Sequence, residues 1–279
     1  MTTDYPALTE VAARVASEAA ELVRAARLDM TAGRTVDVAT KSSQTDLVTA
    51  VDRESEACIR DRLARLRPGE PMLGEEDTGT GVREADAAAG SEDGVTWVVD
   101  PIDGTVNFLY GYPAFAVSVA ARVGGESVAG AVVEPVSGRC WTAGKGHGAW
   151  LGDTPLRVSD PKRIELTLLA TGFAYDARRR ARQGELAGAV LGSVRDIRRS
   201  GSAALDLCAV AAGWVDAYYE HGLSPWDWAA GALIAREAGA LVSPPGADTA
   251  LGADATLAAS PSIADGLREL LVSCGAGRV

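Results

Sequence analysis

Histidine and cysteine, which build most zinc sites and redox centres, are scarce in this chain of 279 residues. Its two histidines, His147 and His221, are too few for a histidine-based metal cage, and we expect both to be ordinary surface or loop residues. The four cysteines form no CxxC pair and occur as Cys58, Cys140, Cys208 and Cys274. We predict that they are reduced thiols and form neither disulfides nor a zinc site.

Long apolar runs and an excess of positive charge are also missing. No stretch approaches the roughly 20 apolar residues of a membrane-spanning helix, and the first ten residues lack the pattern of a signal peptide. The formal net charge of -11 argues against nonspecific binding of nucleic acid or acidic membranes. We therefore expect a cytoplasmic protein without membrane or nucleic-acid partners, which needs bound metal or local cations to handle an anionic substrate.

The composition, with 47% hydrophobic and 23% charged residues, is typical of a globular protein and excludes a disordered chain. The length allows one large domain or two subdomains. Gly, Asp and Pro cluster near residues 152–162. We predict a boundary there, between an α+β subdomain at 1–152 and an α/β subdomain at 153–279.

Hydrophobic periodicity supports this division. It predicts helices over residues 6–28, from Thr49 to about Leu66, and over 184–191, 203–212, 225–238 and 262–273. Strand patterns cover residues 96–99, 115–123, 127–133, 139–142, 164–170, 196–199, 215–219 and 240–243. The hairpin signal Gly124-Gly125 indicates an antiparallel or mixed sheet in the first half. Residues 41–51 are expected to be turn-like, and residues 79–94 to form a surface loop.

The most informative segment joins an apolar strand to two carboxylates in the sequence Asp100-Pro101-Ile102-Asp103-Gly104-Thr105. Pro101 has no N–H and a fixed φ, so we expect the strand to end there with both aspartates on one tight turn. Their repulsion must be relieved by a cation, by protonation or by exposure to water. The segment alone leaves open a solvated turn in which an aspartate caps a helix.

Three further acidic groups adjoin apolar segments, which weakens the interpretation of Asp100 and Asp103 as a solvated turn. They are Asp46 and Asp52 around Leu47-Val48-Thr49-Ala50-Val51, the acids of Gly74-Glu75-Glu76-Asp77, and Asp227 within Trp226-Asp227-Trp228. Carboxylates without interleaved His or Cys suit hard cations such as Mg²⁺ and not zinc. The two indoles beside Asp227 are expected to pack in the interior and not to serve as stacking platforms.

These motifs, in this order along almost the whole chain, resemble the inositol monophosphatase family of Mg²⁺-dependent, lithium-sensitive phosphatases. The resemblance also includes Asn107-Phe108 after the Asp100 motif and Glu220 seven residues before Asp227. It implies a layered αβαβα sandwich, a homodimer and two or three Mg²⁺ ions. Glu75, Asp100 and the carbonyl of Ile102 would hold the first ion, Asp100, Asp103 and Asp227 the second, and Glu75 a weaker third.

The resemblance also implies roles around the substrate. Thr105 and Asp52 would orient the attacking water, helped by Glu75, and the N–H groups of Gly104 and Thr105 would face the phosphate. Gly201 and Ala203 would contact substrate hydroxyls, and Glu220 would accept from another. The implied substrate-binding set is Asp103, Gly104, Thr105, Gly201, Ala203, Glu220 and Asp227. Without the resemblance, the plain start of a helix stays open as an alternative for Gly201.

The implied reaction is hydrolysis of inositol 1-phosphate by in-line attack of metal-activated water. Fructose 1,6-bisphosphate, histidinol phosphate and 3'-phosphoadenosine nucleotides are alternative substrates within the family. A binding protein of the transcription machinery that retains the fold is an alternative of another class. The arginine-rich run 178–182 is a solvated helix face or loop, or else a local anion site. Residues 171–175 depart from the relatives where those carry a substrate-contacting serine.

Overall fold

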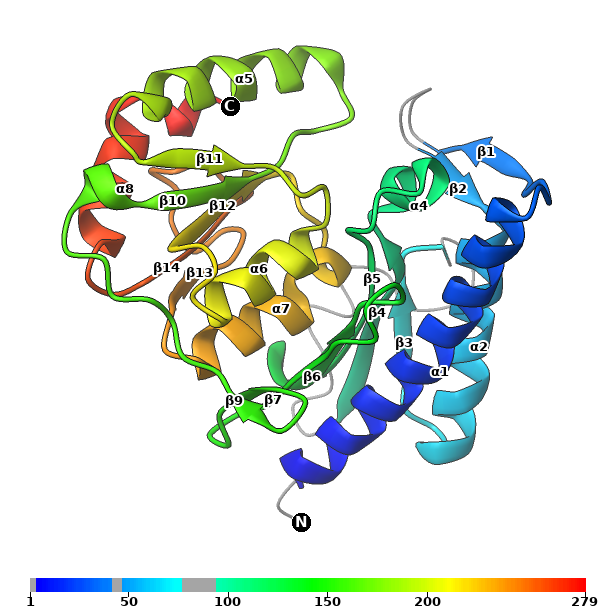
Figure 1. Cartoon of the computed structure of the whole chain (residues 1–279). Helices are drawn as coiled ribbons and strands as arrows, with labels where there is room; N and C mark the ends of the chain where they lie inside the picture. The colour runs from blue at the N-terminus through cyan, green and yellow to red at the C-terminus, as the bar shows by residue number, and fades with distance from the viewer. Residues whose placement is uncertain (1–3, 42–46, 77–93) are drawn as a thin grey trace.

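The computed structural model describes residues 4–41, 47–76 and 94–279. Asp46, Asp77 and almost all of the predicted loop at 79–94 lie outside the described residues. Helices and sheets alternate in five layers (Figure 1), which confirms the predicted αβαβα sandwich. Within the described ranges, no helix combines the length and the apolar character that a membrane span requires.

The first sheet has seven strands and carries the residues around Asp100. Its order is β3-β4-β5-β6-β7-β8-β9, with β3 parallel to β4 and the other neighbours antiparallel. The predicted mixed sheet is therefore confirmed. The strands are β3 (Met72–Gly74), β4 (Val95–Asp103), β5 (Ala116–Val123), β6 (Glu126–Val133), β7 (Cys140–Gly144), β8 (Ala149–Leu151) and β9 (Thr154–Pro155).

Strand β4 does not end at Pro101, so the predicted tight turn is wrong. The strand continues to Asp103 through a register irregularity, in which Asp100 pairs with Ser118 and Asp103 with Ala116. A bulge leaves residues out of the ladder, and a proline without an N–H is tolerated there. The bulge bends the strand between the two aspartates.

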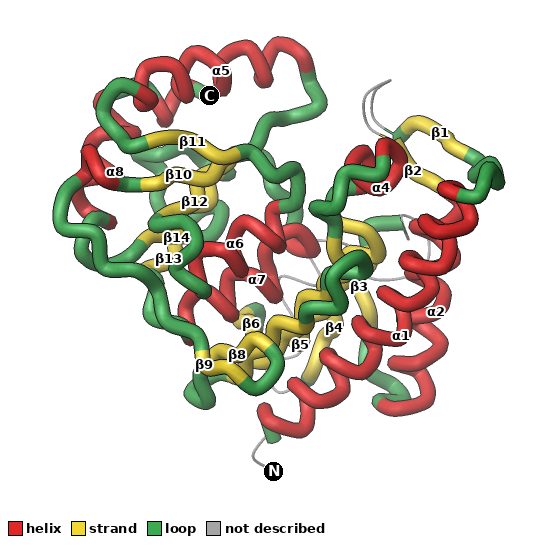
Figure 2. The backbone as a smooth tube through the Cα atoms, in the orientation of Figure 1, coloured by secondary structure: helices red, strands yellow, loops and turns green. Residues whose placement is uncertain are grey.

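Two long helices cover the outer face of this sheet (Figure 2): α1 (Tyr5–Thr31) and α2 (Ala50–Leu66). Their apolar faces share one core with β4, β5 and β6. The predicted capping box at the start of α2 is present, because Thr49 and Asp52 bond each other's backbone N–H groups. The segment 41–51, expected to be turn-like, contains strand β2 (Leu47–Thr49), which pairs with β1 (Val38–Thr40) just before it.

The second sheet has the order β11-β10-β12-β14-β13. Its strands are β10 (Leu168–Thr171), β11 (Asp196–Arg198), β12 (Ala217–His221), β13 (Leu241–Ser243) and β14 (Ala255–Ala259). Strand β14 was not predicted, since three of its five residues are alanines with little strand propensity. Strand β12 begins and ends two residues later than predicted. Glu220 consequently lies inside the strand and not after it.

The outer layer on this side contains α5 (Ala177–Leu191) and α8 (Ala264–Ser273). Helix α5 begins seven residues earlier than predicted, because Asp176 caps it by accepting from the N–H of Arg179. Residues 178–182 are therefore helical. Residues 164–166, predicted as the start of a strand, form the 3₁₀ turn η1 (Ile164–Leu166), and a second turn η2 (Ala276–Arg278) ends the chain.

Helices α6 (Ala203–Ala211) and α7 (Pro225–Glu237) form the middle layer between the sheets. They share one core with the seven-stranded sheet, to which both Trp226 and Trp228 contribute, as predicted for packing residues. Helix α7 comes after the predicted boundary in the sequence. It nevertheless packs on the seven-stranded sheet, most of whose strands come before that boundary. The division at 152 and 153 therefore stays a prediction.

The close approach of α6 and α7 gives a stability test. A Cβ at Gly231 would lie 2.8 Å from Cβ of Leu207 across the helix pair. Gly231→Ala should therefore lower the free energy of unfolding by about 1–3 kcal/mol. Gly184→Ala is the matched control, because it adds a methyl to helix α5 in open space and should raise stability by about 0.5–1 kcal/mol. Denaturant unfolding measures both, and equal stabilisation would contradict the close packing.

Candidate active site

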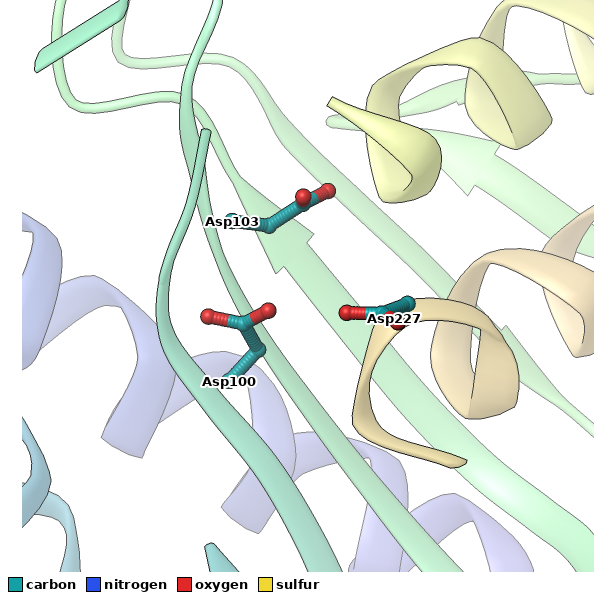
Figure 3. A group of neighbouring side chains, drawn as sticks. All are labelled: Asp100, Asp103 and Asp227. Carbon is teal, nitrogen blue, oxygen red and sulfur yellow. The ribbon is translucent and has the colours of Figure 1, made fainter. Parts of the chain in front are cut away.

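Three aspartates from two layers converge at the bulge of β4. Asp100 and Asp103 extend from β4, and Asp227 extends from the first turn of α7 toward them (Figure 3). Each offers a carboxylate oxygen, and these three oxygens lie within 4.8 Å of one another. Asp100 and Asp103 are buried, and Asp227 is partly buried. The predicted metal-ligand set thus includes three residues that can hold one cation together.

Backbone groups at helix starts hold these carboxylates in place. Oδ2 of Asp103 accepts from Oγ of Ser202 at 2.6 Å and from the N–H of Ala204 at 2.7 Å, at the start of α6. Oδ2 of Asp227 accepts from the N–H of Ser224 at 2.7 Å, which closes the capping box of α7. Free N–H groups at helix N-termini favour negative charge. Both carboxylates therefore retain oxygen atoms for a ligand.

The electrostatics of the cluster disfavour its charged form without a cation. Burial, followed by the charges of Glu75, Asp103 and Asp227, raises the pKa of Asp100 well above its ordinary value. Burial, followed by the charges of Asp103, Glu75 and Glu220, also raises the pKa of Asp227 well above its ordinary value. Burial raises the pKa of Asp103 to about 6, although its hydrogen bonds to α6 oppose the shift. A hard divalent cation fits this all-oxygen donor set.

Glu75 lies beside the aspartates and is bridged to Lys41. Nζ of Lys41 is 2.7 Å from Oε1 of Glu75 and also contacts Glu76. Burial raises the pKa of Glu75, while Lys41 and a hydrogen bond with Asp100 oppose the shift. The pKa of Glu76 rises to about 7, again mainly through burial. Nothing in the sequence predicted Lys41, because 34 residues separate it from its partner.

The predicted water-orienting pair is in contact. Oγ1 of Thr105 donates to Oδ1 of Asp52 at 2.9 Å, or alternatively to the carbonyl of Ile102 at 3.1 Å. Oδ2 of Asp52 accepts from the N–H of Thr49 at 2.8 Å. Burial raises the pKa of Asp52, and the bonds from Thr49 and Thr105 oppose this. The Thr105–Asp52 bond therefore joins α2 to the start of α4 (Thr105–Tyr110), while the roles of both residues stay predictions.

A cavity of about 310 Å³ opens beside the aspartates. Every predicted substrate-binding residue except Thr105 lines it, namely Asp103, Gly104, Gly201, Ala203, Glu220 and Asp227. Gly104 and Gly201 have φ values of +99° and +94°, which favour glycine. Residues 172–175, where the sequence departs from the relatives, also line the cavity. The substrate contact expected in this segment therefore has a place, but its identity stays open.

Glu220 also lines this cavity and is held by Tyr218. The Tyr218 hydroxyl donates to Oε2 of Glu220 at 2.6 Å, and a Cβ at Gly172 would lie 1.9 Å from that oxygen. Burial raises the pKa of Glu220 to about 7, opposed by the bond from Tyr218 and the charge of Arg199. Asp206, a further buried acid lining the cavity, has a pKa raised by burial to about 8. The sequence reasoning missed Tyr218, Arg199 and Asp206, since each lies within an ordinary helix or strand pattern.

Other sequence predictions have mixed outcomes. His147 is exposed in a turn as expected, but His221 is buried in β12 and accepts or donates at 2.8 Å to the carbonyl of Leu251, so that prediction is wrong. The arginine run is only partly solvated. Arg179 lines the cavity and pairs with Asp254 at 2.6 Å, and Arg180 bonds the carbonyls of residues 174 and 175. All four cysteines are free, as predicted.

Comparison with known proteins now decides the family. The model of the family described as "Inositol monophosphatase family" matches residues 4–275. The chain belongs to this family. It is 54% identical over 267 residues to the inositol-1-monophosphatase of Mycobacterium leprae, covering 92% of this chain and 90% of that protein. The resemblance carried by the four motifs is thereby confirmed, and the protein is a phosphatase of the inositol monophosphatase family.

Two further comparisons extend the likeness. The solved structure of Mycobacterium tuberculosis SuhB superposes with a TM-score of 0.81 at 44% identity, over 99% of this chain and 100% of that chain. The Nus factor SuhB of Escherichia coli is 41% identical over 206 residues, 74% of each chain. The relatives of this chain therefore include proteins named inositol-1-monophosphatase and proteins named Nus factor.

The raised pKa of Asp100 predicts that replacing this residue raises the stability of the metal-free protein and lowers its activity. An aspartate whose pKa is raised by folding destabilises the fold progressively as pH rises above its unfolded pKa of about 4. Asp100→Asn should therefore raise the melting temperature of the metal-free protein at pH 7. The same change should lower Mg²⁺-supported phosphatase activity at least about a hundredfold, because it removes a metal ligand.

Asp248→Asn is the matched control. Asp248 lies away from the cavity and its pKa is lowered by Arg268, so its charge stabilises the fold. This variant should be slightly less stable and fully active. A destabilised Asp100→Asn protein, or one with normal activity at ordinary Mg²⁺, would contradict the assignment of the cluster as a metal site.

Proposed function

We propose that this protein is a Mg²⁺-dependent phosphomonoesterase that hydrolyses inositol 1-phosphate to inositol and phosphate by in-line attack of water. The observation that carries the proposal is the convergence of Asp100, Asp103 and Asp227 beside a cavity that Glu220 also lines. The carboxylates provide a place for cations and hence for a phosphate dianion. Glu220 provides an acceptor for a polyol, which the similarity to proteins named inositol-1-monophosphatase supports.

The donor set fits two or three Mg²⁺ ions. Asp100, Asp103 and Asp227 would share one ion, while Glu75 and the Ile102 carbonyl would join Asp100 in holding another. Bound Mg²⁺ supplies positive charge that offsets the carboxylates, polarises the phosphoryl oxygens and makes water more acidic. The Lys41 ammonium, which pairs with Glu75, contributes further positive charge at this edge.

Thr105 and Asp52 would orient the attacking water. Because the Thr105 hydroxyl donates its one hydrogen bond to Asp52, its oxygen keeps lone pairs that can accept a hydrogen bond from the water. The lone pair of that water is then directed toward the phosphate. The N–H groups of Gly104 and Thr105, at the start of α4 (Thr105–Tyr110), would donate to the phosphate oxygens.

Glu220, Gly201 and Ala203, which line the same cavity, would bind the alcohol part of the substrate. Glu220 accepts from a hydroxyl, with its orientation set by Tyr218, and the backbone at Gly201 and Ala203 contacts further hydroxyls. Charged Glu220 is favoured by the Tyr218 bond and the Arg199 guanidinium. Fructose 1,6-bisphosphate, histidinol phosphate and 3'-phosphoadenosine nucleotides are the alternative substrates, and a panel of phosphate-release assays separates them.

A second role, as a binding protein of the transcription machinery, is favoured by the likeness to the Escherichia coli protein named a Nus factor. The buried carboxylate cluster argues that any such role accompanies catalysis. We also propose that the protein is a cytoplasmic homodimer without a membrane partner.

The position of Glu220 predicts substrate-dependent kinetics. Glu220→Gln should lower kcat/KM for inositol 1-phosphate by about ten- to a hundredfold, because a charge-assisted hydrogen bond to a hydroxyl is lost. Hydrolysis of para-nitrophenyl phosphate, which has no such hydroxyl, should stay nearly unchanged. Glu134→Gln is the control, since Glu134 is also a buried glutamate but bonds Trp141 outside the cavity. Equal losses on both substrates in Glu220→Gln would contradict the hydroxyl role.

The proposed nucleophile is water and not a side chain. None of the motifs places a serine or cysteine beside a histidine base, as covalent catalysis requires. A single turnover in water labelled with heavy oxygen should place the label in the released phosphate. Isolation of a phosphorylated enzyme would overturn this mechanism.

A further inference from the structure

A second cavity, of about 560 Å³, lies outside the active site. It is bounded by the turn between β5 and β6, by α7, and by the loop after β13. None of its lining residues lines the catalytic cavity. Its volume is within the range of about 300–1,000 Å³ that is usual for sites that bind small molecules.

The polar side chains of this second cavity are mostly donors. Arg122 on β5 is 8% exposed, bonds the carbonyl of Gly125, and lies 5.5 Å from the Trp228 ring centroid. Arg236, near the end of α7, is the other guanidinium. Neither arginine forms an ion pair with a residue in the described part of the chain. Burial lowers the pKa of Arg122, and no carboxylate in the described segments offsets the effect.

Three buried polar atoms of the lining residues also have no partner within the described residues. They are Nε of Arg122, Oγ of Ser127 and Nε1 of Trp228. Each such unmade hydrogen bond is costly in a buried position. Two of the three atoms can only donate, so the missing partner must be an acceptor.

The remaining wall limits the kind of occupant. The lining includes Pro225, Pro244 and Pro245 together with the Trp228 ring, which form apolar surface. Glu126 is the one acid of the lining, and its carboxylate is already paired with Lys145 at 2.6 Å. Positive charge, unmet donors and an apolar wall together fit an anion that carries a ring or another apolar group.

We propose that this cavity is a binding site for a small organic anion, whose phosphoryl or carboxylate group bonds Arg122 and Arg236 and whose apolar part packs against Trp228 and the prolines. The site is separate from the phosphatase reaction, and the proposal does not depend on the substrate of that reaction. Trp228 follows Asp227 in α7, so occupancy changes the surroundings of an indole and can be followed by fluorescence.

The test is a titration of the full chain, kept metal-free with a chelator, with phenylphosphonate and with benzoate. Without Mg²⁺ the acidic catalytic cluster repels both probes, so binding reports on the second cavity. Calorimetry should give about one bound probe per chain, with a matching change in tryptophan fluorescence. Arg122→Gln should weaken binding at least about tenfold, because a charged donor is lost.

Two variants serve as controls. Arg139→Gln removes an arginine that also lies over an indole, 5.0 Å from the Trp214 ring centroid, but outside this cavity. Arg199→Gln removes one of the two guanidinium groups that line the catalytic cavity, the other being that of Arg179. Both should bind the probes as the parent does, and the melting temperature of each variant verifies its fold.

The outcomes separate the explanations. Binding of either probe that is lost in Arg122→Gln and kept in both controls supports the proposal. Failure of the parent to bind either probe at about 10 mM, near the weak limit of specific recognition, would mean that only water occupies the cavity. Loss in Arg199→Gln but not in Arg122→Gln would place the anion in the catalytic cavity and overturn the proposal.

Discussion

The repulsion between buried carboxylates is the constraint on which the rest of this structure depends. Asp100, Asp103 and Asp227 present oxygens within 4.8 Å of one another, and Glu75 adds a fourth charge beside them. Burial raises the pKa of all four groups, and repulsion from the neighbouring carboxylates adds to the rise for Asp100 and Asp227. Such a cluster is costly for a metal-free fold and becomes favourable only when cations bind.

The layered fold provides the rigid frame that holds these charges together. The bulge of β4 presents two of the aspartates on the same side of the sheet, and α7 brings the third from a segment more than a hundred residues later. Small residues let the middle helices pack closely on each other and on the seven-stranded sheet, as the contacts at Gly231 and Gly130 show. Backbone N–H groups at the starts of α6 and α7 hold two of the carboxylates, those of Asp103 and Asp227.

Local signals made much of this arrangement predictable. The capping box at Thr49, the proline at the start of α7 and the paired aspartates around Pro101 are features of short segments, and the structure contains all of them. Features that depend on tertiary contacts were not predictable. The bulge that continues β4, the later register of β12 and the bridge from Lys41 to Glu75 each depend on partners far along the chain. His221 was misplaced for the same reason, since its burial follows from the neighbouring strand and loop.

We propose that Mg²⁺ relieves the repulsion among these carboxylates, and proton release on metal binding tests this most directly. Calorimetric titration of the metal-free protein with Mg²⁺ at pH 7, in buffers of different ionisation enthalpy, measures the number of protons released. Because the folded carboxylates have raised pKa values, binding should release at least about one proton per chain, and more at lower pH. Mg²⁺ binding without proton release at any pH between about 5 and 7 would contradict the account.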